Sequence, residues 1–441
     1  MVDRSDDAAE RRPSRSGKKS AFIIPPLIAD TTRGAAVARP GHRALDEARI
    51  VLRGEPRSPT PVRLGKLASP LAGLRLMMSV RRPEHPDFYD ELAFEETLSI
   101  AATLQTVGLD TVLVAVGGAL DEGSLLKVRR MPGVSFWPEA ATTLDGGAHL
   151  LDIAHAAGAD LMLLHDPRLV PERRDSLPIL VACTNSPIIR WKTLHGDKPA
   201  PDRLRLDAIL EKRGLIAADR VLAPSRAFAE ALAVEHNLPR RPIVAAPFSL
   251  EILASNLTNP ARDLSDRTYA LSACRLFDDA ADAVTLDRAA SRLDGAVFAA
   301  GPTVGPHARA PGFSDLHCLG PLAWDQIDRL FSRSPVFVST ARARTSGRLV
   351  FRAAARGCAL ILSDLPVHHE MWRGAATFVK PGDAEGFAAA IRRAIEDFEH
   401  RSAMMDASLR RARLLAGMRR GDALHDLLVS ALSGARLTAA E

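Results

Sequence analysis

Short apolar runs alternate with stretches of helical period from about residue 73 to residue 400, and this alternation constrains the fold most strongly. Representative runs are LRLMMSV (74–80), TVLVAVGG (111–118) and CALILSD (358–364). Each has the length of a buried strand, and helical stretches of roughly 10–15 residues separate such runs. The pattern therefore predicts α/β structure, with parallel sheets covered by helices on both faces.

The predicted organisation has two domains, because 441 residues exceed what a single core usually holds. The polar, Pro-containing stretch EILASNLTNPARDLSD interrupts the alternation, and we interpret it as a linker. Doubly wound domains bind ligands beyond the carboxyl ends of their strands, so a cleft is expected there. The predicted units are a first α/β domain over 71–250, the linker 251–266, a second α/β domain over 267–402 and a C-terminal helical tail over 403–441.

The basic charge of the chain belongs to its N-terminal segment. Residues 1–70 hold 14 Lys/Arg and 8 Asp/Glu, whereas the later residues hold 44 and 45. Patches such as RRPSRSGKKS predict disorder for this segment. The alternative is a basic arm that contacts acidic lipid headgroups or a protein partner. No recognition module accompanies the charge, so nucleic-acid binding is not expected.

The cysteines and histidines predict neither disulfides nor a metal site. Cys183, Cys274, Cys318 and Cys358 are scattered without a CxxC pair, so all four are expected to be reduced and buried, as in a cytosolic protein. No acidic or cysteine partner stands at ligand spacing from the histidines. No run of about 18 apolar residues exists, which excludes a spanning helix.

Several segments resemble bacterial retaining glycosyltransferases of family 4. In the second half these are LSACRLFDDAADAVTL (271–286), HCLGPLAWDQIDRLFSRSPVFVSTAR (317–342) and GCALILSDLPVHHEMWRGAATFVKPGDAEGFAAAI (357–391). The first half resembles the family more thinly, mainly in CTNSPIIRWKTLHG (183–196). The resemblance implies the GT-B architecture, in which two Rossmann-like doubly wound domains face each other across a cleft.

The resemblance also implies a function. Members transfer a sugar from a nucleotide-sugar donor to a glycan or lipid-linked acceptor, without a metal or other cofactor. The implied setting is cytoplasmic assembly of a cell-surface polysaccharide, with peripheral membrane contact or a protein partner as further expectations. The chain is then a divergent member, because it lacks the paired glutamates of the donor site.

Arg275 stands where the family places the arginine that meets the donor diphosphate. A guanidinium offers a planar fork of donors to phosphate oxygens, which suits that role. The alternative is a surface arginine that pairs with Asp278 or Asp279. The family's lysine, a few residues on, is replaced by Ala281, so half of the expected phosphate clamp is missing.

Two arginines replace the donor-site carboxylates. Arg344 stands at the position that would contact the donor sugar, and Arg352 at the position that would bind the ribose hydroxyls. Arginine cannot accept hydrogen bonds, so the polarity of the site is reversed. Gly347 remains at a predicted helix start, where backbone N–H groups can face an anion.

Arg344, Arg348, Arg352 and Arg356 recur every four residues. This spacing places the last three on one side of a helix. The row indicates either an anion site or a solvated helix face, and the sequence does not decide between them.

On the acceptor side, the family's Ala-His-Ser triplet is replaced by Thr184–Asn185–Ser186. Asn185 can bond a sugar hydroxyl but cannot titrate. The family's Gly-Gly loop is replaced by RRPEHPDFYDE, which has no glycine. His165–Asp166 at a strand end is a weaker candidate for a cleft pair, and Glu370 is expected to cap the helix after Pro366.

These replacements leave two functions open. The first is a glycosyltransferase with an altered donor site, in which placement of the substrates and diphosphate stabilisation suffice for catalysis. The second is a catalytically impaired GT-B pseudoenzyme that acts as a binding or regulatory partner.

Overall fold

The computed structural model contains two parallel β-sheets and the helices that cover them. It covers residues 69–81, 94, 97–98, 100–102, 104–137, 146–172, 177–238, 243–245, 269–294, 297–305, 310–333, 336–343, 347–417 and 425–433. The predicted linker and all but the last two residues of the N-terminal segment lie outside the described residues.

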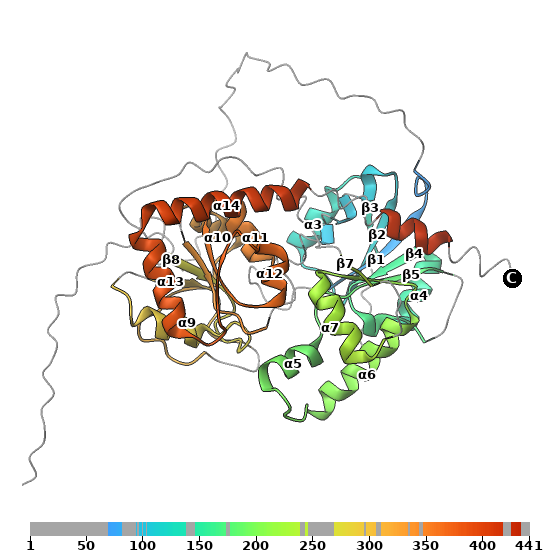
Figure 1. The fold of residues 1–441 in the computed structure, drawn as a ribbon. Helices are drawn as coiled ribbons and strands as arrows, with labels where there is room; N and C mark the ends of the chain where they lie inside the picture. The colour runs from blue at the N-terminus through green and yellow to red at the C-terminus, as the bar shows by residue number, and fades with distance from the viewer. Residues whose placement is uncertain are drawn as a thin grey trace, which may run out of the picture. The chain divides into compact units, whose positions relative to one another are not determined.

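The first sheet has seven parallel strands in the order β3-β2-β1-β4-β5-β6-β7 (Figure 1). Its strands are short apolar runs, and the central ones are buried on both faces, as the sequence pattern predicts. The strand order reverses between β1 and β4, so the carboxyl ends of these two strands open a crevice. The strands are β1 (Arg75–Arg81), β2 (Asp110–Val116), β3 (Val134–Phe136), β4 (Leu161–Leu164), β5 (Ile179–Ala182), β6 (Arg220–Ala223) and β7 (Ile243–Ala245).

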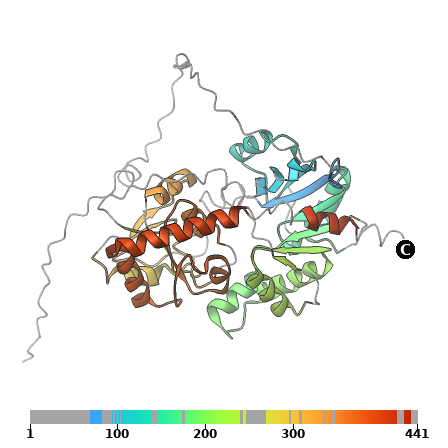
Figure 2. The same ribbon diagram turned by 45° about the horizontal axis from the view of Figure 1, so that its top comes forward.

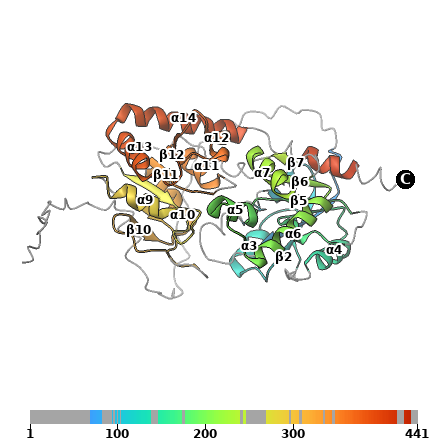
Figure 3. The same cartoon turned by 60° about the horizontal axis from the view of Figure 1, so that its bottom comes forward.

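Helices cover both faces of this sheet and bury two apolar clusters against it. Helical residues between 94 and 106 lie on one of these faces. Helix α5 packs against both α6 and α7 (Figure 3). The remaining elements are α3 (Glu122–Arg129), α4 (Gly146–Ala156), the 3-10 helix η1 (Pro167–Leu169), α5 (Pro187–His195), α6 (Asp202–Ala217) and α7 (Arg226–His236).

The second sheet has six parallel strands in the order β10-β9-β8-β11-β12-β13. Its order reverses between β8 and β11, which places a second crevice at the carboxyl ends of those strands. The strands are β8 (Ala270–Ala273), β9 (Val297–Ala300), β10 (His317–Gly320), β11 (Val336–Ser339), β12 (Ala359–Ser363) and β13 (Thr377–Val379). The helices are α9 (Ala283–Ala290), α10 (Trp324–Arg333), α11 (Arg348–Ala355), α12 (Pro366–Trp372), α13 (Ala384–Glu396) and α14 (Phe398–Gly417).

Two doubly wound parallel sheets confirm the predicted fold class. Some predicted strands were longer than the observed ones; for example, the predicted run 358–364 contains β12, which covers only Ala359–Ser363. The prediction missed α3 and α5. The cysteine prediction was wrong at Cys318, which is exposed, because β10 lies at the edge of its sheet.

The end of the chain contributes to both halves of the structure. Helix α14 packs on α11, α13 and β12 of the second half, where it appears as the long red helix (Figure 2). The helical residues 425–433 pack instead on the first sheet, where Leu427 and Leu428 are buried among residues of β1 and β2. The Arg220 Nε donates to Ser430 Oγ at 3.1 Å. Nothing in the sequence predicts this packing of the final helix.

Candidate functional site

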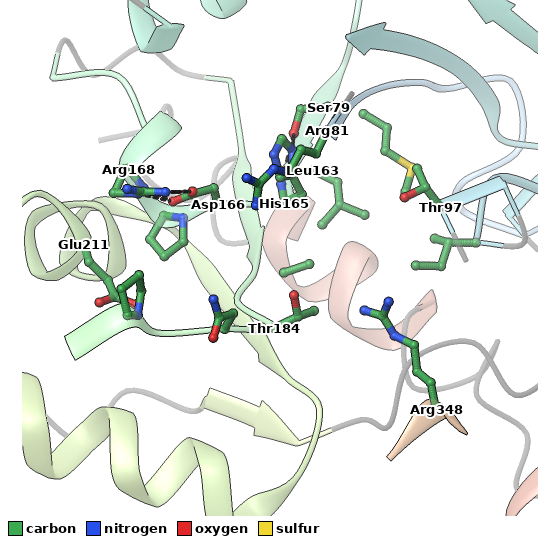
Figure 4. Close-up of a pocket in the computed structure, with 16 residues that line it drawn as sticks. Ser79, Arg81, Thr97, Leu163, His165, Asp166, Arg168, Thr184, Glu211 and Arg348 are labelled. Carbon is green, nitrogen blue, oxygen red and sulfur yellow. Dashed lines mark hydrogen bonds and ion pairs between the residues drawn. The ribbon is translucent and has the colours of Figure 1, made fainter. Parts of the chain in front are cut away.

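A polar pocket of about 220 Å³, here called pocket A, lies at the carboxyl ends of β1, β4 and β5. This is the edge of the first sheet where the strand order reverses. Neutral polar groups of Ser79, Thr97, Thr184 and Asn185 line it, together with His165 (Figure 4). Such groups exchange hydrogen bonds with hydroxyls without requiring a charge on the ligand.

Ser79 positions the ring of His165. The Ser79 Oγ accepts the backbone N–H of His165 at 2.9 Å and lies 2.7 Å from its Nδ1. A hydroxyl can donate to a ring nitrogen or accept from it, so this contact fits either neutral tautomer. Burial lowers the pKa of His165 to about 4, against the opposing effect of Asp166. At neutral pH His165 is therefore an uncharged polar group at the pocket wall.

Asp166 and Arg168 form a second part of this wall. Burial opposes ionisation of Asp166, but the hydrogen bonds and charge of Arg168 keep the pKa of its carboxyl below the usual value. The Arg168 Nη2 lies 2.6 Å from Asp166 Oδ2, and its Nη1 lies 3.1 Å from Asp207 Oδ1. The Asp166 carboxylate also accepts the Arg168 backbone N–H at 2.9 Å and thereby caps η1. These charges stabilise one another within the protein.

A buried carboxylate holds the loop that carries Asn185. Glu211 of α6 is only 3% exposed, and its Oε2 accepts the hydroxyl of Ser186 at 2.9 Å. The Nε2 of His236 lies 3.2 Å from the same oxygen. The Cys183 thiol lies 3.6 Å from the carbonyl oxygen of Asn185. These contacts hold the loop at Asn185, which lines pocket A. Its role toward a sugar stays a prediction.

A second pocket of about 430 Å³, here called pocket B, adjoins pocket A. Thr184 and Asn185 are among the residues that line both. Five arginines and one carboxylate line pocket B, a formal charge of +4, with Asp278 ion-paired to Arg190. The arginines are Arg81, Arg190, Arg275, Arg342 and Arg348.

Arg275 lies in pocket B, directly after β8, where the resemblance predicts it. Asp278, one of the two carboxylates offered as an alternative partner, forms an ion pair with Arg190. The missing lysine position, Ala281, also lines this pocket. Arg342 follows β11 and lines the same pocket, so positive charge comes from another strand end.

The row of arginines on α11 does not act as a unit. Arg348, the first residue of α11, lines both pockets. Arg352 is buried, with its guanidinium 3.9 Å from the ring centroid of Trp324. The Arg356 Nε donates to Asp328 Oδ1 at 2.9 Å. The row is therefore not a solvated helix face, and Arg352 is absent from the linings of pockets A and B.

The structure says less about two other donor-site candidates, Arg344 and Gly347. Arg344 lies outside the described residues. Gly347 precedes α11 with φ of −108°, and an added Cβ would lie 3.6 Å from Trp372 Nε1, an ordinary contact. Its local geometry does not require glycine, and the role of its N–H group toward an anion stays a prediction.

Glu370 caps a different helix from the one expected. Its carboxylate accepts the backbone N–H groups of Arg226 and Ala227, both at 2.9 Å, at the start of α7. The predicted role at the start of α12 was therefore wrong. Two N–H groups that have no partner within α7 are satisfied by a residue of the second half.

The sequence reasoning missed Arg81, Arg190 and Arg342 and did not single out Arg348 within its row. Arg81 follows immediately on the predicted strand 74–80, and Arg342 lies three residues after β11. This position near a strand's carboxyl end was the available signal. In the described part of the chain, no group of three or more His, Cys, Asp or Glu side chains is arranged to hold a metal ion. None of the described helices is long and apolar enough to cross a lipid bilayer.

Comparison with known proteins gives the same architecture. Residues 277–397 match the family model described as Glycosyl transferases group 1. No curated protein matches the sequence.

Solved structures with the GT-B fold match most of the chain. Sucrose-phosphate synthase from Thermosynechococcus elongatus is 14% identical with a TM-score of 0.62, over 83% of this chain and 100% of that one. HepE from Anabaena in complex with UDP-glucose is 15% identical with a TM-score of 0.58, over 82% and 100%. The trehalose 6-phosphate synthase from Burkholderia multivorans is 16% identical with a TM-score of 0.57, over 84% and 98%. The fold is GT-B, with two Rossmann-like domains.

Proposed function

We propose that the protein transfers a sugar from a nucleotide-sugar donor to a glycan or other acceptor. The observation that carries the proposal is the junction of two unlike pockets, which share Thr184 and Asn185. Pocket B has a formal charge of +4, whereas pocket A combines uncharged polar groups with three arginines and two carboxylates, a formal charge of +1. A cationic pocket suits a diphosphate, and a pocket lined by hydroxyls, an amide and a neutral imidazole suits a sugar.

Pocket B is the proposed donor site. As the bond between the sugar and the diphosphate breaks, negative charge grows on the leaving oxygen. Arg275, Arg342 and Arg348 line this pocket and can stabilise that charge. Arg342 and Arg348 would supply the charge that the family's lysine, Ala281 here, no longer provides. A fixed cluster of donors stabilises such charge with little reorganisation during the reaction.

Pocket A is the proposed acceptor site. The neutral imidazole of His165 can exchange a hydrogen bond with a sugar hydroxyl, and Asn185 can both donate and accept. Placement of the acceptor hydroxyl next to the donor contributes to the rate because it removes the entropy cost of bringing two molecules together. The residues of pocket A need no metal ion for this role.

The family resemblance supports finer proposals. These are retention of the anomeric configuration, membership of family 4 and a role in cell-surface polysaccharide assembly in the cytoplasm, with membrane or protein contacts. HepE was crystallised with UDP-glucose and with UDP, which makes uridine nucleotides the first donors to test.

A catalytically impaired GT-B pseudoenzyme is the second candidate. The buried stacking of Arg352 on Trp324 favours it, because the position expected to bind ribose hydroxyls is occupied by a packed cation. In this case the scaffold would serve as a binding or regulatory partner.

A ligand screen followed by turnover separates these candidates. Melting temperatures are measured with UDP, GDP, ADP and their glucose or mannose derivatives. A ligand at about 100 times its Kd adds about 2.7 kcal/mol of stability, so binding is easily detected. Sugar release or transfer from the bound donor supports the enzyme. Binding without turnover supports the pseudoenzyme, and no shift with any nucleotide contradicts the enzyme.

A further inference from the structure

Asp278 places a carboxylate inside the cationic pocket B. Of the described residues that line this pocket, it is the one acidic side chain, and it forms an ion pair with Arg190 of α5. Like charges repel, so a carboxylate in this position lowers the affinity for a phosphate group. The same carboxylate offsets the mutual repulsion of the arginines while the pocket holds no anion.

The turn after β8 holds the Asp278 carboxylate in place. Its Oδ1 accepts the backbone N–H of Ala280 at 2.8 Å, and the Asp278 backbone N–H donates to the carbonyl oxygen of Arg275 at 2.9 Å. The carbonyl oxygen of Ala280 in turn accepts the backbone N–H of Arg342 at 2.9 Å. The turn is therefore tied to the backbone of both arginines, and the carboxylate cannot leave the pocket without breaking this turn.

Arg190 is the member of the ion pair that can move. Its side chain is 43% exposed, whereas that of Asp278 is 25% exposed. Exposed ion pairs add little to stability, because water screens the charges and two side chains lose freedom. The Arg190 guanidinium can therefore exchange its partner at small cost while the backbone of α5 stays in place.

We propose that Asp278 is an internal counter-ion that competes with the donor diphosphate for Arg190. A diphosphate carries on the order of two negative charges and presents several oxygens to a planar guanidinium, so Arg190 turns from Asp278 to the phosphate when the donor binds. Because the ion pair must break, Asp278 limits the affinity of pocket B for the diphosphate. It thereby favours release of the nucleoside diphosphate that remains after sugar transfer. This inference rests on the proposed function and deepens it, because it adds Arg190 and Asp278 to the donor site.

The affinity of the full chain for UDP tests this competition. Isothermal titration calorimetry measures the Kd of UDP, or of the nucleoside diphosphate that binds best, for wild type, Asp278→Asn and Asp279→Asn. Asparagine keeps an oxygen that can accept the Ala280 N–H, so Asp278→Asn removes the charge and retains the turn. We expect Asp278→Asn to bind the diphosphate about threefold more tightly than wild type, or better. Asp279 is exposed and does not line pocket B, so Asp279→Asn is the matched control and should stay within about twofold of wild type.

A double-mutant cycle separates an exchange of partners from simple repulsion. If Arg190 leaves Asp278 for the phosphate, Asp278→Asn removes the cost of breaking the pair, and this part of the improvement requires Arg190. The improvement should therefore be at least about twofold smaller in the Arg190→Gln background. Arg190→Gln alone should weaken binding, because a phosphate contact is lost and Asp278 is left without its partner. Circular dichroism and melting curves check that each variant is folded.

The outcomes distinguish this inference from the proposed function. No binding of any nucleoside diphosphate, by wild type or by Asp278→Asn, contradicts the proposed function. Binding by wild type that Asp278→Asn leaves unchanged or weakens overturns the counter-ion role alone. An equal improvement with and without Arg190 overturns the exchange, because Asp278 would then act by repulsion without releasing Arg190.

Discussion

Gly214→Ala should destabilise the first half of the protein and disturb pocket A, because α6 lies directly against η1 at this point. A Cβ added to Gly214 would lie 1.8 Å from the carbonyl oxygen of Pro167 and 2.6 Å from its carbonyl carbon. The obstacle is backbone, so it cannot rotate away. Real Cβ contacts are seldom closer than about 3.4 Å, so the helix and η1 would have to separate by more than an ångström.

The cost follows from overpacking of a tight contact, which is typically about 1–3 kcal/mol. We place this variant near the upper end, because η1 is also tied to the Asp166–Arg168 pair. For a unit of 150–250 residues, about 2–4 °C of melting temperature corresponds to 1 kcal/mol, so a fall of roughly 5–10 °C is expected.

Gly312→Ala is the control, since nothing lies within 4 Å of its added Cβ and no positive φ is recorded there. Differential scanning calorimetry compares both variants with wild type. A Gly214→Ala protein that melts within about 1 °C of wild type would show that α6 does not press on η1 as described. Ligand titration should also show weaker binding in pocket A for Gly214→Ala, because His165 and Asp166 directly precede η1.

Three further predictions concern single residues. Burial keeps His165 neutral in the folded state with a pKa of about 4, whereas the unfolded state binds a proton near pH 6.5. The free energy of unfolding should therefore be fully retained above about pH 6.5 and fall by up to about 3 kcal/mol as the pH falls towards 4, because only the unfolded state then binds the proton. Urea unfolding at several pH values should show this loss, and His165→Asn should reduce it. Glu370→Ala leaves two α7 N–H groups without their acceptor, so we expect a loss of about 1–2 kcal/mol, with Glu370→Gln partly restoring it in the same unfolding assay. Arg352→Lys removes the planar group stacked on Trp324, so it should lower the free energy of unfolding by about 1 kcal/mol and leave nucleotide affinity within twofold of wild type. A large loss of nucleotide affinity would show that Arg352 contributes to the donor site.

The alternation of apolar runs predicted the fold because each buried parallel strand needs such a run. The same property predicted where ligands could bind, since Arg275 and Asn185 both follow strands of the observed sheets. The ends of strands were less predictable: Leu177, Pro178 and Cys183 beside β5 are apolar but lie outside the strand, so hydrophobicity does not mark where it begins and ends.

Contacts between distant segments could not be predicted from local patterns. The helical period placed Arg352 and Arg356 on one side of α11, but only the packing of α10 decides that they meet Trp324 and Asp328. Likewise, Glu370 follows Pro366 as a helix-capping residue would, yet its carboxylate is used by α7. A single sequence does not show which distant residues will be in contact in the fold.

The most direct test of the central claim is the affinity of pocket B for a nucleoside diphosphate. Isothermal titration calorimetry measures the Kd of UDP, or of the diphosphate that binds best, for wild type, Arg275→Ala and Arg393→Ala. Arg393 lies on α13 away from both pockets and controls for the loss of one positive charge. Loss of a charge-assisted contact to phosphate should weaken binding about tenfold or more in Arg275→Ala, or roughly 1.4 kcal/mol, and leave Arg393→Ala near wild type. Equal affinities for all three proteins, or no binding by any, would contradict the assignment of pocket B as the donor site.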